Sequence, residues 1–164
     1  MQRSVPALAV LAAGAAVAIP LTSAGAQSPG PRTITLVEHN KGSSFGFVDN
    51  PPRIRHRRRP VLSPGDMTVL STPVFDETNR TPRGRLHVQC TTTRGGTEKR
   101  ADELCTGVYR LSDGQISLTT LLHGNPKVIT GSVTGGDGAY AGARGTFRSQ
   151  TTRTGATDTI TLLA

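Results

Sequence analysis

The residues that first suggest chemistry are the five glycines of Val133–Gly145, which lie between two strand-like runs. Glycine-rich segments beside strands often cradle phosphates, but such a site needs a helix that follows at once and points its N-terminal amides at the anion. The residues after Gly145 resume the alternation of a strand, and no lysine follows the glycines as in a P-loop. We therefore interpret the stretch as a structural crossover in which Tyr140 packs over one end of the fold and Arg144 holds nearby carbonyls. The residues given this structural role are Gly135, Gly136, Gly138, Tyr140, Arg144 and Gly145.

Two cysteines, Cys90 and Cys105, are the next candidates, and they lack the CxxC spacing typical of metal sites. The four histidines are scattered, so we predict neither a metal site nor a cofactor. If the strands around the two cysteines form a hairpin, positions 90 and 105 face each other, at a separation that suits a disulfide after a small adjustment. We predict this disulfide, and a free Cys90 thiol inside the fold is the alternative.

The formal net charge is +8, and much of it lies in the run Arg53–Arg59. Prolines on both sides of this run exclude a helix laid into a groove, and aromatic residues for base stacking are missing. We therefore predict a solvated loop, with disorder over 43–63, and no nucleic-acid partner. Weak binding to anionic surfaces is the remaining role for the basic run.

The first 26 residues have the layout of a secretory signal peptide. One arginine, Arg3, precedes the apolar run Val5–Leu21, and alanines occupy both small positions of a cleavage site ending at Ala26. A single membrane anchor is the alternative, which Pro20 and the predominance of alanine over leucine disfavour. The sequence predicts a secreted protein with a signal peptide (1–26), a flexible N-terminus (27–32) and one domain (33–164).

The rest of the chain is rich in threonine, valine, isoleucine and glycine, and its apolar residues alternate with a period of two. This pattern predicts an all-β domain with almost no helix. We expect an eight-stranded antiparallel up-and-down barrel in preference to a sandwich, because closure removes the exposed edges. The predicted strands are Thr33–Glu38, Asp66–Asp76, Gly84–Thr93, Glu103–Leu111, Gln115–His123, Lys127–Thr134, Gly145–Thr152 and Thr157–Leu163.

The alternation also assigns faces to these strands. Val88 and Cys90 share one face of their strand, and Asp158 shares a face with Ile160 and Leu162. Tryptophan is absent and aromatic residues make up 4% of the chain, so the interior is mostly aliphatic. A barrel of eight strands either fills this interior or holds one small ligand.

Several motifs together resemble the allene oxide cyclase and dirigent superfamily, in particular its small exported bacterial members. The most specific is V-T-G-G-D-G-A-Y-A-G-A-R-G at 133–145, supported by Gly65-Asp66, the strand Arg85–Cys90 and the hairpin Leu111–Ile116. The resemblance covers roughly Ile34–Leu163. It implies an eight-stranded barrel around an apolar cavity, where a reactive molecule is held for cyclisation or for the coupling of phenoxy radicals.

The resemblance also implies site residues. Glu38 and Asn40 reproduce the spacing of a glutamate and an asparagine that point into the cavity of the cyclases, which implies a catalytic role for both. The cyclases carry a cavity cysteine where Cys90 falls, a role that a disulfide would remove. Related proteins often form oligomers, so a dimer or trimer is expected. The residues predicted to line the cavity are Leu36, Val88, Tyr109 and Leu118.

Two functions are compatible with these features. The first is an exported barrel that binds a small, largely apolar molecule and steers its cyclisation or coupling; as an enzyme it would be an isomerase or cyclase without a cofactor. The second is a non-catalytic extracellular barrel that binds a ligand or an envelope polymer. The sequence identifies neither the substrate nor the ligand.

Overall fold

A computed structural model describes residues 30–51 and 61–163 of the chain. The predicted signal peptide, residues 27–29 of the predicted flexible N-terminus and the basic run Arg53–Arg59 lie outside these residues. No helix in the described part of the chain is long and apolar enough to cross a membrane.

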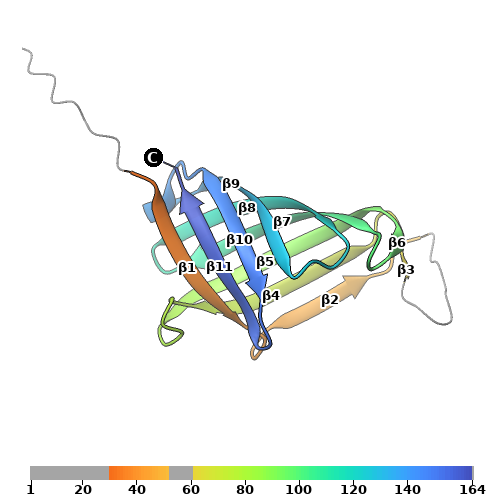
Figure 1. Ribbon diagram of the computed structural model, residues 1–164, viewed down its shortest axis with the longest axis horizontal. Coiled ribbons are helices and arrows are strands. Elements are labelled where there is room, and N and C mark those ends of the chain that lie inside the picture. Colours follow the sequence, from red (N-terminus) through yellow and green to blue (C-terminus); the bar gives the residue numbers. More distant parts are fainter. Residues whose placement is uncertain (1–29, 52–60, 164) are drawn as a thin grey trace, which may run out of the picture.

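The protein is all-β, and eight antiparallel strands close into a barrel (Figure 1). Going round the barrel, the order is β1, β4, β5, β7, β8, β9, β10 and β11, with β11 pairing again with β1. Because neighbours in space are largely neighbours in sequence, this is the predicted up-and-down meander, and the fold prediction is confirmed. The elements are β1 (Arg32–His39), β2 (Ser44–Val48), β3 (Val61–Leu62), β4 (Met67–Phe75), β5 (Pro82–Arg94), β6 (Gly96–Thr97), β7 (Asp102–Leu111), β8 (Gly114–His123), β9 (Val128–Gly136), the 3-10 turn η1 (Gly138–Tyr140), β10 (Gly145–Thr151) and β11 (Gly155–Leu162).

Strand β2 corrects one prediction. Disorder over 43–63 is wrong for Ser44–Val48, which pairs antiparallel with β4 from Ser44↔Ser71 to Val48↔Met67. The segment S-F-G-F-V has the alternation of a strand, but the prolines and arginines that follow it dominated the composition of the region. Short strand β3 also falls inside the predicted range.

Strands β1 and β2 behave as one strand interrupted by a bend, because both pair antiparallel with β4. The bend is fixed by hydrogen bonds: the Ser43 hydroxyl lies 2.7 Å from both the His39 carbonyl oxygen and Thr72 Oγ1. Gly42 adopts φ = 83°, a left-handed conformation that glycine takes readily. Beyond this bend β2 pairs with β4 but not with β11, so the barrel wall is incomplete beside β2.

The core fills the end of the barrel nearest the C-terminus. Tyr140 closes this end; it is 2% exposed and its hydroxyl donates to the Asp113 carboxylate at 3.0 Å. The other apolar side chains here come from every side of the barrel, as the period-two pattern requires. They include Leu111, Ile116, Val133, Ile160 and Leu162.

The glycine-rich stretch is closely packed at Gly136 and turns sharply at Gly138. A Cβ on Gly136 would lie 2.4 Å from the Tyr140 carbonyl oxygen, so no larger residue fits without a shift. Gly138 has φ = 55° and begins the short turn η1, which is too short to offer an anion site. The strand β9 continues through Gly136, two residues past its predicted end. Arg144 is exposed, and its backbone oxygen accepts a hydrogen bond from the Leu163 amide at 2.8 Å.

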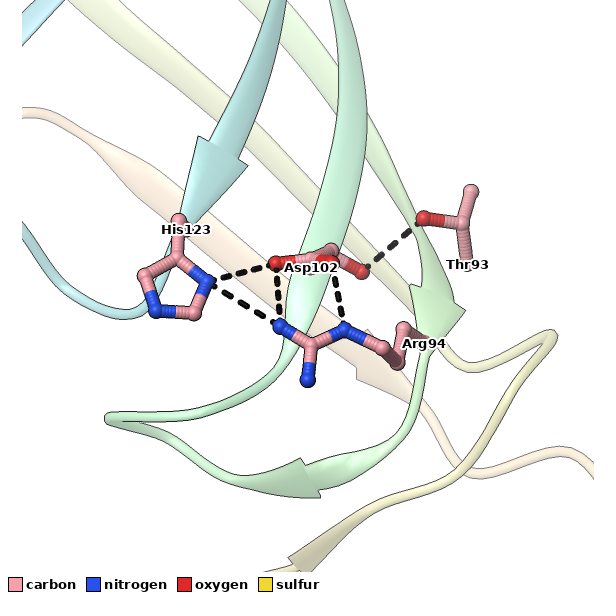
Figure 2. A network of polar contacts seen from close by, with 4 residues as sticks. All are labelled: Thr93, Arg94, Asp102 and His123. Atoms are coloured by element: carbon pink, nitrogen blue, oxygen red, sulfur yellow. Dashed lines mark hydrogen bonds and ion pairs between the residues drawn. The ribbon is translucent and has the colours of Figure 1, made fainter.

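The opposite rim joins the ends of three strands through a polar network (Figure 2). Arg94 of β5 binds both carboxylate oxygens of Asp102 of β7, at 2.6 and 3.0 Å, and His123 Nδ1 of β8 lies 2.7 Å from Asp102. The hydrogen bonds from Arg94 lower the pKa of Asp102 to about 2. The stabilisation from the ionised Asp102 carboxylate is therefore fully present at pH values above the ordinary pKa of aspartate. It is lost as the pH falls through about 2.

Candidate functional site: a barrel cavity with a carboxyl pair

A cavity of about 320 Å³ lies in the half of the barrel where β1 ends and β11 begins. Its volume is within the range of small-molecule sites, which starts at about 300 Å³. Most of the wall is apolar, and a few polar groups from β1, β10 and β8 interrupt it. Phe45 of β2 stands at the opening and is 71% exposed. The apolar wall includes Leu86, Val88, Leu118, Leu122, Ile129 and Phe147.

Glu38 contributes a carboxyl group to this wall. Its position in β1 is paired with Ala156 on one side and Val74 on the other, which directs the side chain inward with Leu36. Burial, together with the neighbouring Asp158 carboxylate, raises the pKa of Glu38 to about 9. At neutral pH Glu38 is thus a neutral acid, able to donate a hydrogen bond to an oxygen atom inside the cavity.

Asp158 lies behind Glu38 on the inner face of β11, in register with Leu36 and Ser149, and is 0% exposed. Burial raises the pKa of Asp158, and this effect outweighs the lowering by Glu38, Ser149 and Tyr109. The buried phenol of Tyr109 also has its pKa raised, first by burial and then by the charges of Asp158 and Glu38. Two carboxyls and a phenol thus form one buried polar cluster, in which Glu38 and Tyr109 border the cavity.

The other predicted site residues are distributed as follows. Val88, Tyr109 and Leu118 line the cavity. Asn40 is exposed at the lip of the cavity, and its backbone amide donates to the Thr154 carbonyl oxygen at 2.9 Å. Leu36 is 1% exposed and belongs to the packed core beside the cavity rather than to its wall.

The disulfide between Cys90 and Cys105 is present, which confirms that prediction. The two residues are directly opposed in the β5–β7 pairing, and both line the cavity. The alternative of a free Cys90 thiol is thereby removed, and with it any role as a cavity nucleophile.

Two members of the site were missed by sequence reasoning as functional residues. Asp158 carried a usable signal, because it alternates in phase with the core residues Ile160 and Leu162. Aspartate is rarely buried unless its carboxyl group is paired or hydrogen-bonded, so its position on a buried face indicates a specific role. Phe45 carried less signal, because it lies in the segment that was expected to be disordered.

Comparison with solved protein structures identifies the fold of this chain. No family model matches the chain, and no curated protein matches it. Among solved structures, a pyocyanin demethylase superposes with a TM-score of 0.65 at 21% identity, covering 80% of this chain and 99% of that chain. A pterocarpan synthase dirigent protein gives a TM-score of 0.59 at 16% identity, with coverage of 83% and 87%. The protein has the dirigent-like barrel fold. AbnU, an exo-specific intermolecular Diels-Alderase, shares this dirigent-like barrel with a TM-score of 0.60 at 12% identity, covering 83% of this chain and all of that chain.

Proposed function

We propose that this dirigent-like barrel binds a small, largely apolar molecule in its cavity and steers the cyclisation or coupling of that molecule. The observation that carries the proposal is the cavity itself: an apolar chamber of about 320 Å³ whose wall includes one neutral acid, Glu38. The solved structures with the same fold include a dirigent protein and a Diels-Alderase, which agrees with such a role.

The physical basis is positioning. Holding the reacting ends of one molecule close together removes several kcal/mol of barrier, on the order of 7–11 kcal/mol in the best intramolecular cases. The Glu38 hydroxyl adds a directional contact, because a protonated carboxyl donates to an oxygen that gains negative charge during reaction. Asn40 at the lip offers a second amide donor and is proposed to orient the outer end of the molecule. No cofactor is needed for this chemistry.

Export is part of the proposal. The N-terminal pattern of residues 1–26 favours secretion, and a disulfide is the kind of bond that persists in oxidising compartments. The family resemblance implies a dimer or trimer, and we propose an oligomer of one of these two sizes.

Filling the cavity should abolish binding of an apolar probe. We expect 1-aminoanthracene, a neutral aromatic probe, to bind the wild-type protein with fluorescence enhancement, because its rings fit the apolar wall. Val88→Trp should reduce its affinity at least about tenfold, since the indole occupies the chamber. Val69→Trp is the matched control, because Val69 lies on neighbouring strand β4 with its side chain on the outer face, 41% exposed.

The two variants together decide the proposal. Equal loss in two variants that circular dichroism shows to be folded would place the probe in the outer hollow of about 570 Å³ that Val69 and Val88 both line, and would contradict the proposed function. Unchanged binding in Val88→Trp, with a folded protein, would place the probe outside the cavity and would contradict the proposed function.

A further inference from the structure

Asp158 is an unusual residue for the inside of a barrel. It is 0% exposed, and neither carboxylate oxygen receives a hydrogen bond of ordinary geometry from the described residues, although Glu38, Ser149 and Tyr109 face it. A buried carboxylate without donors is costly, by several kcal/mol when it is fully isolated. Such a group is retained in a fold either because it is protonated or because something else supplies the missing contact.

The carboxyls of Asp158 and Glu38 act as one unit. Two adjacent carboxyls do not both ionise easily, and burial raises the pKa of each, so a positive charge beside the pair would favour its ionised form. Tyr109, the titratable group facing the pair from β7, is neutral under the same conditions because its pKa is raised well above 10. The hydroxyl of Ser149 faces the pair from β10 and adds no charge.

No positive charge compensates the pair from the cavity side. Among the described residues that line the cavity there is no lysine, arginine or histidine, although the chain as a whole has a formal charge of +8. The surrounding wall is apolar, which strengthens any electrostatic interaction inside it. A cationic ligand would therefore meet carboxyl oxygens with no competing side-chain cation among the described cavity residues, whereas an anionic ligand would meet no counter-charge.

We propose that the cavity selects ligands with an apolar body and a cationic or N–H-bearing nitrogen at the buried end, which binds the carboxyl pair through Glu38. Glu38 borders the cavity and Asp158 lies behind it, so the ligand nitrogen contacts the Glu38 carboxyl, and Asp158 acts on the ligand through Glu38. This inference rests on the proposed function and deepens it, because it names the chemical class of the ligand. A metal ion is a poorer fit, since the described residues contain no group of three or more histidine, cysteine or acidic ligands.

The ligand would lie along the cavity axis. Its apolar body would contact Leu86, Leu118 and Phe147, and its nitrogen would lie within hydrogen-bonding reach of Glu38. A cation that forms during a cyclisation would be stabilised by the same carboxyl oxygens, because preorganised polar groups stabilise the charge that develops in a transition state.

Three probes of one shape and different charge test this inference. They are 4-tert-butylbenzylamine, 4-tert-butylbenzyl alcohol and 4-tert-butylbenzoate, measured by isothermal titration calorimetry at pH 7 against the full-length protein. The amine is protonated at this pH and should bind at least about tenfold more tightly than the alcohol, and the benzoate more weakly than both. In Asp158→Asn the ratio of the amine affinity to the alcohol affinity should fall to within about threefold, because the amide removes one of the two acidic groups.

The outcomes separate this inference from the proposed function. Binding of the alcohol with no preference for the amine would overturn the charge selection alone. Failure of all three probes to bind would overturn the proposed function as well. If Asp158→Asn does not fold, the wild-type comparison still decides, because equal binding of the amine and the benzoate contradicts selection of a cation by the carboxyl pair.

Discussion

The free energy of unfolding of the wild-type protein is expected to fall as the pH rises from about 5 to 9, and Glu38→Gln is expected to remove most of this slope. The folded pKa of Glu38 is raised to about 9 by burial and by Asp158, above its ordinary value of 4.5. Between these values the unfolded chain has lost the proton and the folded chain retains it, so raising the pH favours unfolding. One proton corresponds to a slope of roughly 1.4 kcal/mol per pH unit.

Urea denaturation at one-unit pH steps measures this slope. Glutamine keeps the shape of the protonated glutamate and can donate to Asp158, so the variant should be more stable than the wild type at pH 8. Glu77→Gln is the control, because it makes the same chemical change in the exposed turn after β4. It should leave the pH dependence of the free energy of unfolding as it is in the wild type. A slope in Glu38→Gln equal to that of the wild type would show that Glu38 is ionised in the folded barrel.

Removing the disulfide should lower the free energy of unfolding by about 3 kcal/mol. The bond closes a loop with a sequence separation of 15, and restricting a loop of that length in the unfolded chain accounts for a stabilisation of this size. The double variant Cys90→Ala/Cys105→Ala, denatured in urea, measures the loss. It also removes two sulfur atoms from the cavity wall, so probe affinity should change even where the barrel remains folded.

Reduction of the wild type provides the control for the disulfide. Dithiothreitol should lower the stability of the wild-type protein by a similar amount and have no effect on the double variant. A loss below about 1 kcal/mol in both experiments would mean that the neighbouring β5–β7 ladder alone fixes the two strands.

The barrel could be predicted from the sequence because the relevant signals are local. Alternation with a period of two placed Val88 and Cys90 on the inner face of β5, and the hairpin pairing that followed brought Cys90 opposite Cys105. The same alternation placed Asp158 with Ile160 on the inner face of β11. These inferences need only neighbouring residues and the geometry of a strand.

The carboxyl pair could not be predicted in the same way, because it depends on distant strands. Glu38 and Asp158 come from opposite ends of the domain sequence and meet only when β1 pairs with β11 at the closure of the barrel. Whether an inward position faces a cavity or a packed core is also set by closure: Leu36 is packed, while Glu38, two residues later, borders open space. The strand β2 was missed because the composition of the following segment, rather than its own alternation, governed the prediction.

The central claim is that an apolar molecule binds inside the barrel with one end at Glu38. The most direct measurement is a set of intermolecular nuclear Overhauser effects between 1-aminoanthracene and methyl-labelled protein. The account predicts contacts from the probe to the methyl groups of Val88, Leu118 and Ile129, which line the cavity. Contacts confined to Val69 and Leu104 on the outer surface, or no contacts at saturating probe, would contradict it.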